Sequence, residues 1–272
     1  MLRLKVLQHY LFKKNNVSFL NIISFLFSIP HQFKVGKYIE KVDLSNKLYT
    51  KIWFYNINTP LFFPIKYKIN LLYQTILETF QKNNWHYYEL PETRVCDNDV
   101  VVDCGAAEGL FSLSCFNRAK HVYLIEPLDV FVNSLKQTFL DIKNITIIEK
   151  AISSKSFFTN IVDNGLASSL SESNKKSENK IEVSTLDKLF YDKGIPITYI
   201  KIDLEGYDFL ALLGAERLIK KNKPKIAVTT YHDVNHLLEI KEFLSKIVPE
   251  YNFIHKGIFS DTGAPVMLHA WI

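Results

Sequence analysis

From Asp99 to the end of the chain, short apolar runs alternate with stretches in which apolar residues recur at helical spacing. The short runs predict five buried strands, at 100–103, 122–125, 145–149, 197–202 and 225–230. The periodic stretches predict helices at 105–116, 130–140, 207–220 and 234–247. Two further runs, 252–255 and 266–272, predict a closing pair of strands. This alternation favours an α/β fold with a parallel, doubly wound sheet and helices on both faces.

An insertion interrupts the alternation at 153–193, between the third and fourth parallel strands. Residues 157–162 and 180–184 alternate in polarity as strands do. Residues 171–180 are polar and charged, and they predict a solvated loop.

Residues 1–98 differ in composition, being rich in aromatic residues, Lys and Asn, with Gly36 as the single glycine. Apolar spacing predicts helices at 19–29 and 68–82, and the residues at 47–57 predict a strand that Pro60 and Pro64 end. The apolar run 19–29 is shorter than the roughly 20 residues that span a bilayer, so we expect no transmembrane segment and only weak contact with a membrane surface. We predict an α-rich N-terminal extension, 1–98, followed by an α/β domain, 99–272.

The net charge and the low Arg content of the chain limit the classes of partner that it is expected to bind. The 272 residues include 33 Lys and Arg against 28 Asp and Glu, which gives a formal net charge of +5, and only four of the basic residues are Arg. Because Arg is the usual residue for bidentate contacts to bases and phosphates, this composition argues against nucleic acid as a partner. It is compatible with an anionic small molecule.

The cysteines indicate the redox environment. Cys96, Cys104 and Cys115 are odd in number and contain no CxxC pair. This argues against the disulfide framework of a secreted protein and against a Cys-rich zinc site. We expect a reduced, cytoplasmic protein.

The segment VVDCGAAEG (101–109) contains the residues expected to bind a cofactor, because ligands of doubly wound sheets bind at the carboxyl ends of the strands. Gly105 allows a sharp turn, and Gly109 allows a close approach of helix or ligand. Asp103 could accept hydrogen bonds from an ammonium group. Glu126, at the end of the next strand, could accept both hydroxyls of an adenosine ribose.

Two adenosine cofactors remain open at this point. Dinucleotide binding requires GxGxxG, and Ala107 stands where the second Gly would admit the pyrophosphate. This weakens the alternative of an NAD(P)-dependent Rossmann oxidoreductase. S-adenosylmethionine has no phosphate and carries an α-ammonium, so it suits Asp103 better.

The chain resembles the FkbM-type S-adenosylmethionine-dependent methyltransferases from about Asp99 to Ile272. The motifs that carry the resemblance are VVDCGAAEGLFSL (101–113), YLIEP (123–127), EKAIS (149–153), STLDKL (184–189) and YIKIDLEGYDFLALLGA (199–215). The resemblance implies a Rossmann-like class I methyltransferase fold, with a seven-stranded, mostly parallel sheet closed by an antiparallel strand pair. One departure is Ala107-Glu108, where the family more often has Asn after Gly-Ala.

The resemblance also implies a set of cofactor-binding residues at these motifs. Asp103, Gly105, Ala106 and Gly109 would line the methionine and ribose, Glu126 would hold the ribose, and Ala151 and Ile152 would border the adenine. The full expected set is Asp103, Gly105, Ala106, Ala107, Glu108, Gly109, Glu126, Pro127, Ala151 and Ile152.

Methyl transfer to an alcohol requires removal of a proton, so a general base is expected at a strand end. The candidates are Asp203 with Glu205 after the fourth strand and His232 after the fifth. His232 has the better ordinary pKa for a base near neutral pH. Asp203 could orient it, or could join it and Glu205 around a divalent cation, although nothing in the spacing demands a metal. The two acids could also simply cap the next helix.

The acceptor implied by the resemblance is a hydroxyl of a sugar, as in a nucleotide-activated sugar or a surface-polysaccharide precursor. Trp53, Trp85, Tyr87 and Tyr88 could stack on a sugar ring or could belong to the core. We expect the extension and the insertion to form a lid over the acceptor, and the extension could instead mediate a homodimer. The remaining alternative is a non-catalytic membrane-surface or scaffold protein that retains the fold.

Overall fold

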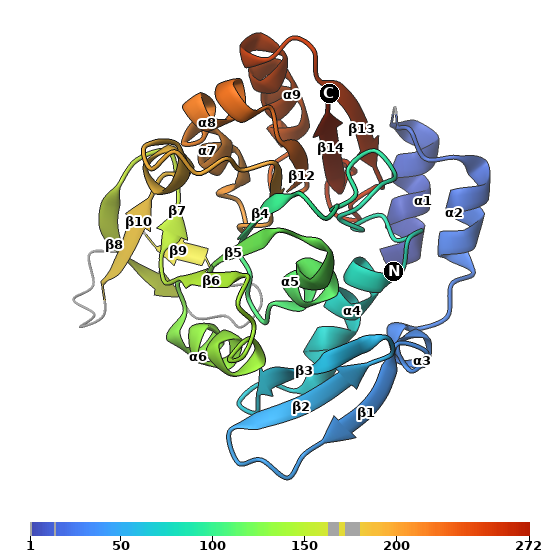
Figure 1. The fold of residues 1–272 in the computed structure, drawn as a ribbon. Coiled ribbons are helices and arrows are strands. Elements are labelled where there is room, and N and C mark those ends of the chain that lie inside the picture. The colour runs from blue at the N-terminus through green and yellow to red at the C-terminus, as the bar shows by residue number, and fades with distance from the viewer. Residues whose placement is uncertain (1, 14, 163–168, 172–179) are drawn as a thin grey trace.

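The central sheet has seven strands in the order β13-β14-β12-β11-β4-β5-β6 (Figure 1). The structure is a computed structural model that describes residues 2–13, 15–162, 169–171 and 180–272. The strands are β4 (Val100–Cys104), β5 (His121–Ile125), β6 (Ile145–Ile148), β11 (Tyr199–Ile202), β12 (Lys225–Thr229), β13 (Asn252–Lys256) and β14 (Met267–Trp271). Strands β6, β5, β4, β11 and β12 run parallel, whereas β14 is antiparallel to both of its neighbours. The predicted seven-stranded sheet with its closing strand pair is therefore confirmed.

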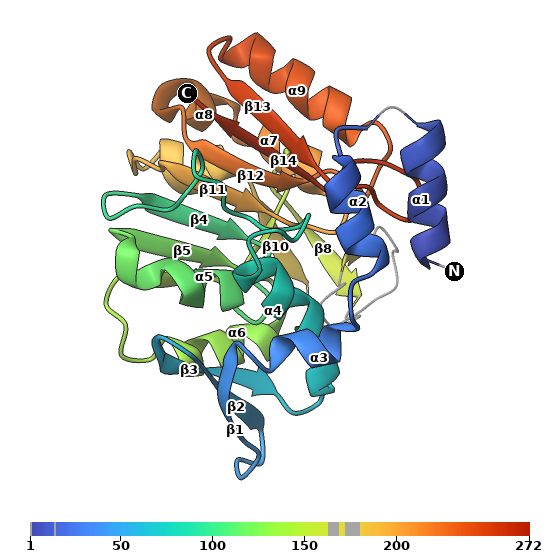
Figure 2. The same ribbon diagram turned by 90° about the vertical axis from the view of Figure 1, so that its right-hand side faces the viewer.

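Helices cover both faces of this sheet (Figure 2). They are α5 (Leu110–Cys115), α6 (Asp129–Thr138), α7 (Asp208–Leu213), α8 (Glu216–Asn222) and α9 (His236–Ile247), with a 3₁₀ turn η2 (Phe116–Arg118) after α5. Val101 packs with α5 and α6 on one face, and Val102 packs with α7, α8 and α9 on the other, as alternate strand residues must. The helix predicted at 207–220 is divided at Gly214, where a Cβ atom would lie 2.3 Å from the carbonyl oxygen of Ser153.

The N-terminal extension contains helices and a small antiparallel sheet. Its elements are α1 (Leu2–Phe12), α2 (Phe19–Leu26), α3 (His31–Val35), β1 (Ile39–Asp43), β2 (Tyr49–Phe54), β3 (Ile57–Pro64), the 3₁₀ turn η1 (Ile69–Leu71) and α4 (Leu72–Phe80). Pro60 and Pro64 were expected to end a strand, but both lie within β3. The sheet order β1-β2-β3 places β3 at an edge, where a missing backbone N–H is tolerated.

The extension and the α/β domain share one apolar core. Buried Phe63 of β3 and Leu72 of α4 belong to the same cluster as Leu110 of α5 and Phe131 of α6. The backbone N–H of residue 62 also donates to Thr138 Oγ1 of α6 at 3.0 Å. The extension is thus packed against the domain along α5 and α6.

The insertion and the short strand β7 that precedes it form a separate four-stranded sheet in the order β7-β10-β8-β9. Its strands are β7 (Ala151–Ile152), β8 (Phe157–Val162), β9 (Ser169–Ser171) and β10 (Ile181–Ser184), followed by a π-helical turn η4 (Asp187–Tyr191). The strands predicted at 157–162 and 180–184 are present, and most of the loop predicted at 171–180 lies outside the described residues. Within the described part of the chain, no helix combines the length and the apolar composition needed to cross a membrane.

Candidate functional site

The loop after β4 lies directly against the loop after β11. Gly105 has a φ of +74°, and a Cβ atom there would lie 2.1 Å from the carbonyl oxygen of Asp203. Only glycine fits this backbone approach without displacing the neighbouring chain. Gly109 precedes α5 with a φ of +85°, and a Cβ there would lie 2.4 Å from a methyl carbon of Leu135. The two glycines expected from the sequence therefore stand where close approach occurs.

Asp103 is fully buried, and its carboxylate is engaged inside the protein. Its Oδ1 lies 3.0 Å from Nζ of Lys201, and its Oδ2 accepts a hydrogen bond of 2.7 Å from Ser112 Oγ. Lys201 Nζ also donates to the carbonyl oxygen of Gly105 at 2.7 Å. Burial alone would lower the pKa of Lys201, but Asp103 and Asp203 raise this pKa above its ordinary value. Lys201 was not predicted as a site residue. The sequence signal that could have identified it is a charged residue inside an apolar strand.

Glu126 and Glu108 are buried carboxyl groups beside the same loop. Glu126 accepts hydrogen bonds from the backbone N–H groups of Ala107 and Leu128, each at 2.9 Å. Burial raises the pKa of Glu126 and of Glu108 to about 7. Glu108 Oε2 has no hydrogen-bond partner among the described residues, and Glu108 lines a cavity of about 60 Å³ beside Gly105. A buried acceptor of this kind suits a ligand with N–H or O–H donors.

The other expected cofactor-binding residues lie along the same edge of the sheet. Ala106 and Ala107 continue the loop after β4 and line the 60 Å³ cavity. Pro127 follows the end of β5. Ala151 and Ile152 are buried in β7, which follows β6 closely, and they do not line that cavity.

A chain of ionisable side chains, buried at Asp208 and partly exposed at Glu205, joins the loops after β11 and β12. Asp208 begins α7, is fully buried and accepts hydrogen bonds from two backbone N–H groups of the loop 204–206 and from Thr229 Oγ1. Its Oδ2 lies 2.9 Å from Nδ1 of His232, whose Nε2 lies 3.3 Å from Oε2 of Glu205. Glu205 has a φ of +49°, a left-handed conformation that is uncommon for a residue with a side chain. Asp208 was not expected from the sequence, although it lies in the 199–215 motif.

The carboxylates on either side change the protonation of His232. Burial lowers the pKa of His232, but hydrogen bonds to Asp208 and Glu205 raise it to about 10. The pKa of Asp208 is lowered by His232, although burial opposes this. His232 therefore carries a proton at neutral pH. This differs from the expectation of a neutral base, which depended on the ordinary pKa of histidine near 6.5.

Asp203 is held by residues of the segment that follows α4. Tyr88 donates a hydrogen bond from its hydroxyl to Asp203 Oδ2 at 2.7 Å, and His86 Nε2 lies 3.7 Å from the same oxygen. His86 Nδ1 lies 2.7 Å from Oε1 of buried Glu78. Burial would lower the pKa of His86, but Glu78 raises it above its ordinary value. Glu78 and His86 were missed from the sequence, because nothing local marks two residues that meet only through the packing of α4.

The geometry offers one candidate group of metal ligands among the described residues. One atom each of Asp203, Asp208 and His232 lie within 4.8 Å of one another, and oxygen with imidazole is a reasonable ligand set for a divalent cation. Both nitrogens of His232 face carboxylates, however, and both oxygens of Asp208 already accept hydrogen bonds. The arrangement favours a hydrogen-bonded chain over a metal site.

Comparison with known proteins gave a family and several similar folds. The sequence model of the methyltransferase FkbM domain matches residues 103–260, more than half of the chain. No match was found among curated proteins. The crystal structure of the methyltransferase FkbM from Methylobacillus flagellatus KT is similar, with a TM-score of 0.50 and 23% sequence identity. That alignment covers 75% of this chain and 56% of the other, so this chain spans little more than half of that protein's length.

Two structures solved with S-adenosylmethionine are more distant. TYW2 from M. jannaschii aligns over 85% of this chain and 88% of its own, with 12% identity and a TM-score of 0.47. Fibrillarin from Aeropyrum pernix aligns over 68% and 71%, with 12% identity and a TM-score of 0.43. The family match is the decisive finding, since it includes the Gly105 loop, the 199–215 motif and His232. The chain belongs to the methyltransferase FkbM domain family.

Proposed function

We propose that the chain is an S-adenosylmethionine-dependent O-methyltransferase whose acceptor is a hydroxyl of a sugar, in a nucleotide-activated sugar or a surface-polysaccharide precursor. The observation that carries this proposal is the partly buried group of Asp203, Glu205 and His232 after the ends of neighbouring strands, beside the Gly105 loop. An alcohol gives up a proton when it is methylated, and a positioned ionisable side chain can accept that proton.

The residues beside the Gly105 loop fit the cofactor in chemical terms. S-adenosylmethionine supplies a methyl group on a positively charged sulfonium, and its ammonium and hydroxyl groups require acceptors. Glu108 Oε2 is such an acceptor, Glu126 would hold the ribose, and Ala151 and Ile152 would border the adenine. Asp103 would act indirectly, by holding Lys201 against the Gly105 carbonyl.

The cavity beside this loop must widen to take the whole cofactor. Its volume of about 60 Å³ is far below the range of about 300–1,000 Å³ that is usual for small-molecule sites. Glu108 lines this cavity, and it makes no side-chain hydrogen bond through Oε2 within the described residues, so its outward movement breaks no such contact. We expect this side chain to move when the cofactor binds.

Asp203 is the residue to which we attribute removal of the acceptor proton. Its carboxylate lines the 60 Å³ cavity and is oriented by the hydroxyl of Tyr88. His232 is already protonated at neutral pH, so it acts as a fixed positive charge that holds Glu205 and Asp208 in place. In this arrangement the hydroxyl proton passes to the Asp203 carboxylate as the new carbon–oxygen bond forms.

Incubation with S-adenosylmethionine and a panel of free sugars, sugar phosphates and nucleotide sugars tests the proposal. Mass spectrometry should show the gain of one methyl group on an acceptor oxygen, together with release of S-adenosylhomocysteine. Methylation of a nitrogen or carbon acceptor would contradict the O-methyltransferase assignment. Binding of S-adenosylmethionine without turnover of any acceptor in the panel would favour the non-catalytic alternative, and a preference for NAD would favour the oxidoreductase.

A further inference from the structure

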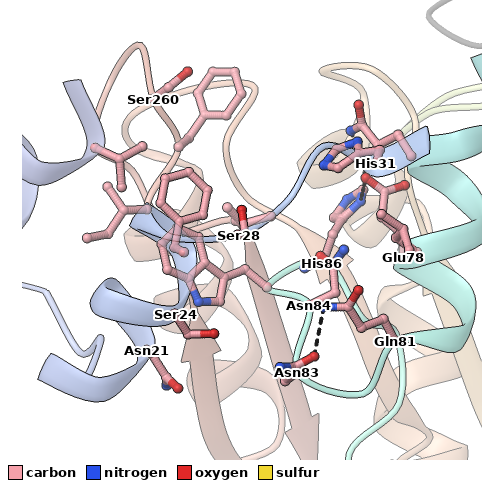
Figure 3. A pocket seen from close by; sticks show the side chains of 18 of the residues that line it. Asn21, Ser24, Ser28, His31, Glu78, Gln81, Asn83, Asn84, His86 and Ser260 are labelled. Carbon is pink, nitrogen blue, oxygen red and sulfur yellow. Dashed lines mark hydrogen bonds and ion pairs between the residues drawn. The ribbon is translucent and has the colours of Figure 1, made fainter. Parts of the chain in front are cut away.

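We propose that the N-terminal extension builds the acceptor-binding site, and that its ligand is a sugar that carries a phosphate group. The inference rests on the proposed function, since it names the acceptor of the same reaction. The site is a cavity of about 350 Å³ between α1–α4 and the loop that joins β13 to β14 (Figure 3). This volume falls within the range of about 300–1,000 Å³ that is usual for small-molecule sites.

The lining of this cavity comes mostly from outside the matched family domain. Of the described lining residues, Tyr231 and 258–260 lie within 103–260, whereas the others come from 2–86 and from Val266. The extension therefore supplies most of the side chains that a ligand in this cavity would contact. Choice of acceptor is a property that a cavity lined mostly from outside the matched domain can supply.

A wall of side chains separates this cavity from the 60 Å³ cavity beside the Gly105 loop. Glu78 of α4 lines the larger cavity, whereas Thr75 and Thr79 of the same helix line the smaller one. His86 lines the larger cavity, and its Nε2 lies 3.7 Å from Oδ2 of Asp203, which lines the smaller one. Direct transfer of the hydroxyl proton to Asp203 therefore requires the His86 side chain to move aside when the acceptor binds.

The lining combines aromatic rings with amide groups, a combination that suits a sugar ring. Trp85 stacks on Phe25 with ring centroids 4.8 Å apart, and Tyr231 lies against Phe259 at 4.6 Å. The amide side chains in the lining are Asn21, Gln74, Gln81, Asn83 and Asn84. Aromatic faces provide apolar contact for the C–H face of a sugar, and each amide can both donate to and accept from its hydroxyls.

Lys34 adds a positive charge to the lining that favours a phosphate. Glu78, the acidic residue of the described lining, is already paired with His86, and no described carboxylate lies within ion-pair distance of Lys34. Burial together with the charges of Arg3 and Lys37 lowers the pKa of Lys34. A phosphate beside Lys34 would supply the missing negative charge through charge-assisted hydrogen bonds.

Isothermal titration of the full chain with glucose, glucose 1-phosphate and UDP-glucose, without a methyl donor, tests this site. A phosphate-bearing probe should bind at least about tenfold more tightly than glucose. Lys34→Met should remove this preference, whereas Lys37→Met removes a neighbouring charge outside the lining and should keep it. The two phosphate probes distinguish a sugar phosphate from a nucleotide sugar as the source of the phosphate.

A variant that fills the cavity gives a second test. Ser24 lines the cavity and Leu20 lies on the same helix outside the lining, so Ser24→Trp should abolish probe binding and Leu20→Trp should leave it unchanged. Absence of binding by all three probes, equal binding of glucose and the phosphate probes, or full binding by Ser24→Trp would overturn the proposal. Failure of the proposed function would appear separately, as absence of oxygen methylation while probe binding persists.

A second observation concerns exposed apolar side chains of the segment that contains α1–α3. Leu4, Phe12, Leu20, Phe27 and Phe33 are between 68% and 82% exposed. The described basic residues of this segment are Arg3, Lys5, Lys13, Lys34 and Lys37, of which Lys5 forms an ion pair with Asp261 at 2.8 Å and Lys34 lines the cavity. The first acidic residue of the chain is Glu40. Helices α1 and α2 lie side by side at one edge of the molecule (Figures 1 and 2). We infer that this face binds the surface of an anionic bilayer, because apolar side chains enter the headgroup region while cations attract acidic lipids.

Cosedimentation with vesicles tests this surface. The chain should pellet with phosphatidylcholine vesicles that contain phosphatidylglycerol, should not pellet with phosphatidylcholine alone, and should be released by salt. Phe12→Ser combined with Phe27→Ser should lose binding, whereas Leu140→Ser, at a 73% exposed position of the α/β domain, should retain it. Equal binding to both vesicle types, or a stable dimer in sedimentation velocity that the double variant dissociates, would overturn the inference.

Discussion

Lys201 Nζ lies 3.0 Å from Asp103 Oδ1, and the two side chains are 5% and 0% exposed. The two residues are direct neighbours on the adjacent parallel strands β11 and β4. Removing two charges from water is costly, and the pair is tolerated because each charge is compensated inside the protein. This ion pair holds together the ends of β4 and β11. The Gly105 loop extends from β4, and Asp203, the proposed base, extends from β11.

Lys201→Met should lower the free energy of unfolding by about 3–5 kcal/mol, because it leaves the Asp103 carboxylate buried without its partner. Urea unfolding followed by circular dichroism measures this loss. The double variant Lys201→Met with Asp103→Leu should recover much of it, since no unpaired charge remains. A loss below about 1 kcal/mol in the single variant would be typical of an exposed ion pair and would contradict this account.

His232 should make the stability of the protein depend on pH. Its folded-state pKa, about 10, lies above the ordinary value of 6.5, so its stabilising contribution is complete below about pH 6.5 and is lost as the pH rises toward 10. The measurement is the difference in free energy of unfolding between the wild type and His232→Gln across this interval. A difference that stays constant with pH would show that the pKa of His232 is not raised.

Asp203→Asn should reduce kcat by about 10²–10⁴-fold, the usual contribution of a general base, while the affinity for S-adenosylmethionine changes little. Asp233→Asn is the matched control, because Asp233 is exposed and lies next to His232. Loss of cofactor binding in Asp203→Asn would instead place this residue on the cofactor side.

The pH dependence of kcat/KM of the wild-type enzyme shows whether Asp203 or His232 is the proton acceptor. If Asp203 is the base and protonated His232 holds its neighbours, activity should fall as the pH rises through about 10. A rise in activity toward pH 10 would indicate that deprotonated His232 is the base.

Treatment with EDTA should leave methyl transfer unchanged, because both nitrogens of His232 and both oxygens of Asp208 already have partners within the protein. The measurement is the initial rate before and after chelation, followed by addition of Mg²⁺ or Mn²⁺. Loss of activity that either ion restores would show that Asp203, Asp208 and His232 bind a metal.

Gly214→Ala should destabilise the fold by about 1–3 kcal/mol, because the new Cβ atom would lie 2.3 Å from the backbone oxygen of Ser153. Gly36→Ala is the control, since a Cβ there meets nothing within 4 Å and φ is −55°. That control should be neutral or slightly stabilising. Equal thermal midpoints for the two variants would contradict the packing role of Gly214.

The seven-stranded sheet was predictable because buried parallel strands are continuous apolar runs, and those runs were regularly spaced. β3 was not, because two prolines are acceptable in a strand only at a sheet edge, and edge position is a property of the tertiary structure. The residues of the candidate site likewise include some that the sequence predicts and some that it does not. Asp203, Glu205 and His232 lie within three residues of the ends of β11 and β12, so their convergence follows from the topology of a parallel sheet.

Other members of the candidate site depend on contacts between distant segments. Glu78 and His86 reach the neighbourhood of Asp203 only because α4 packs against α5, and no spacing in the sequence records that packing. The raised pKa of His232 likewise depends on Asp208, whose side chain turns inward from the start of α7. Both features required the structure.

The side chains of His86, Asp203 and Tyr88 lie between the larger cavity and the 60 Å³ cavity, and this position has a kinetic consequence. The proposed methyl donor and acceptor enter from opposite sides, so neither ligand crosses the other's path, and these side chains must move aside for the acceptor oxygen to reach the sulfonium methyl group. Initial-rate patterns should then be those of a random-order, two-substrate reaction. A methylated acceptor could depart while spent cofactor is still bound, and each half of the site could exchange its ligand on its own timescale.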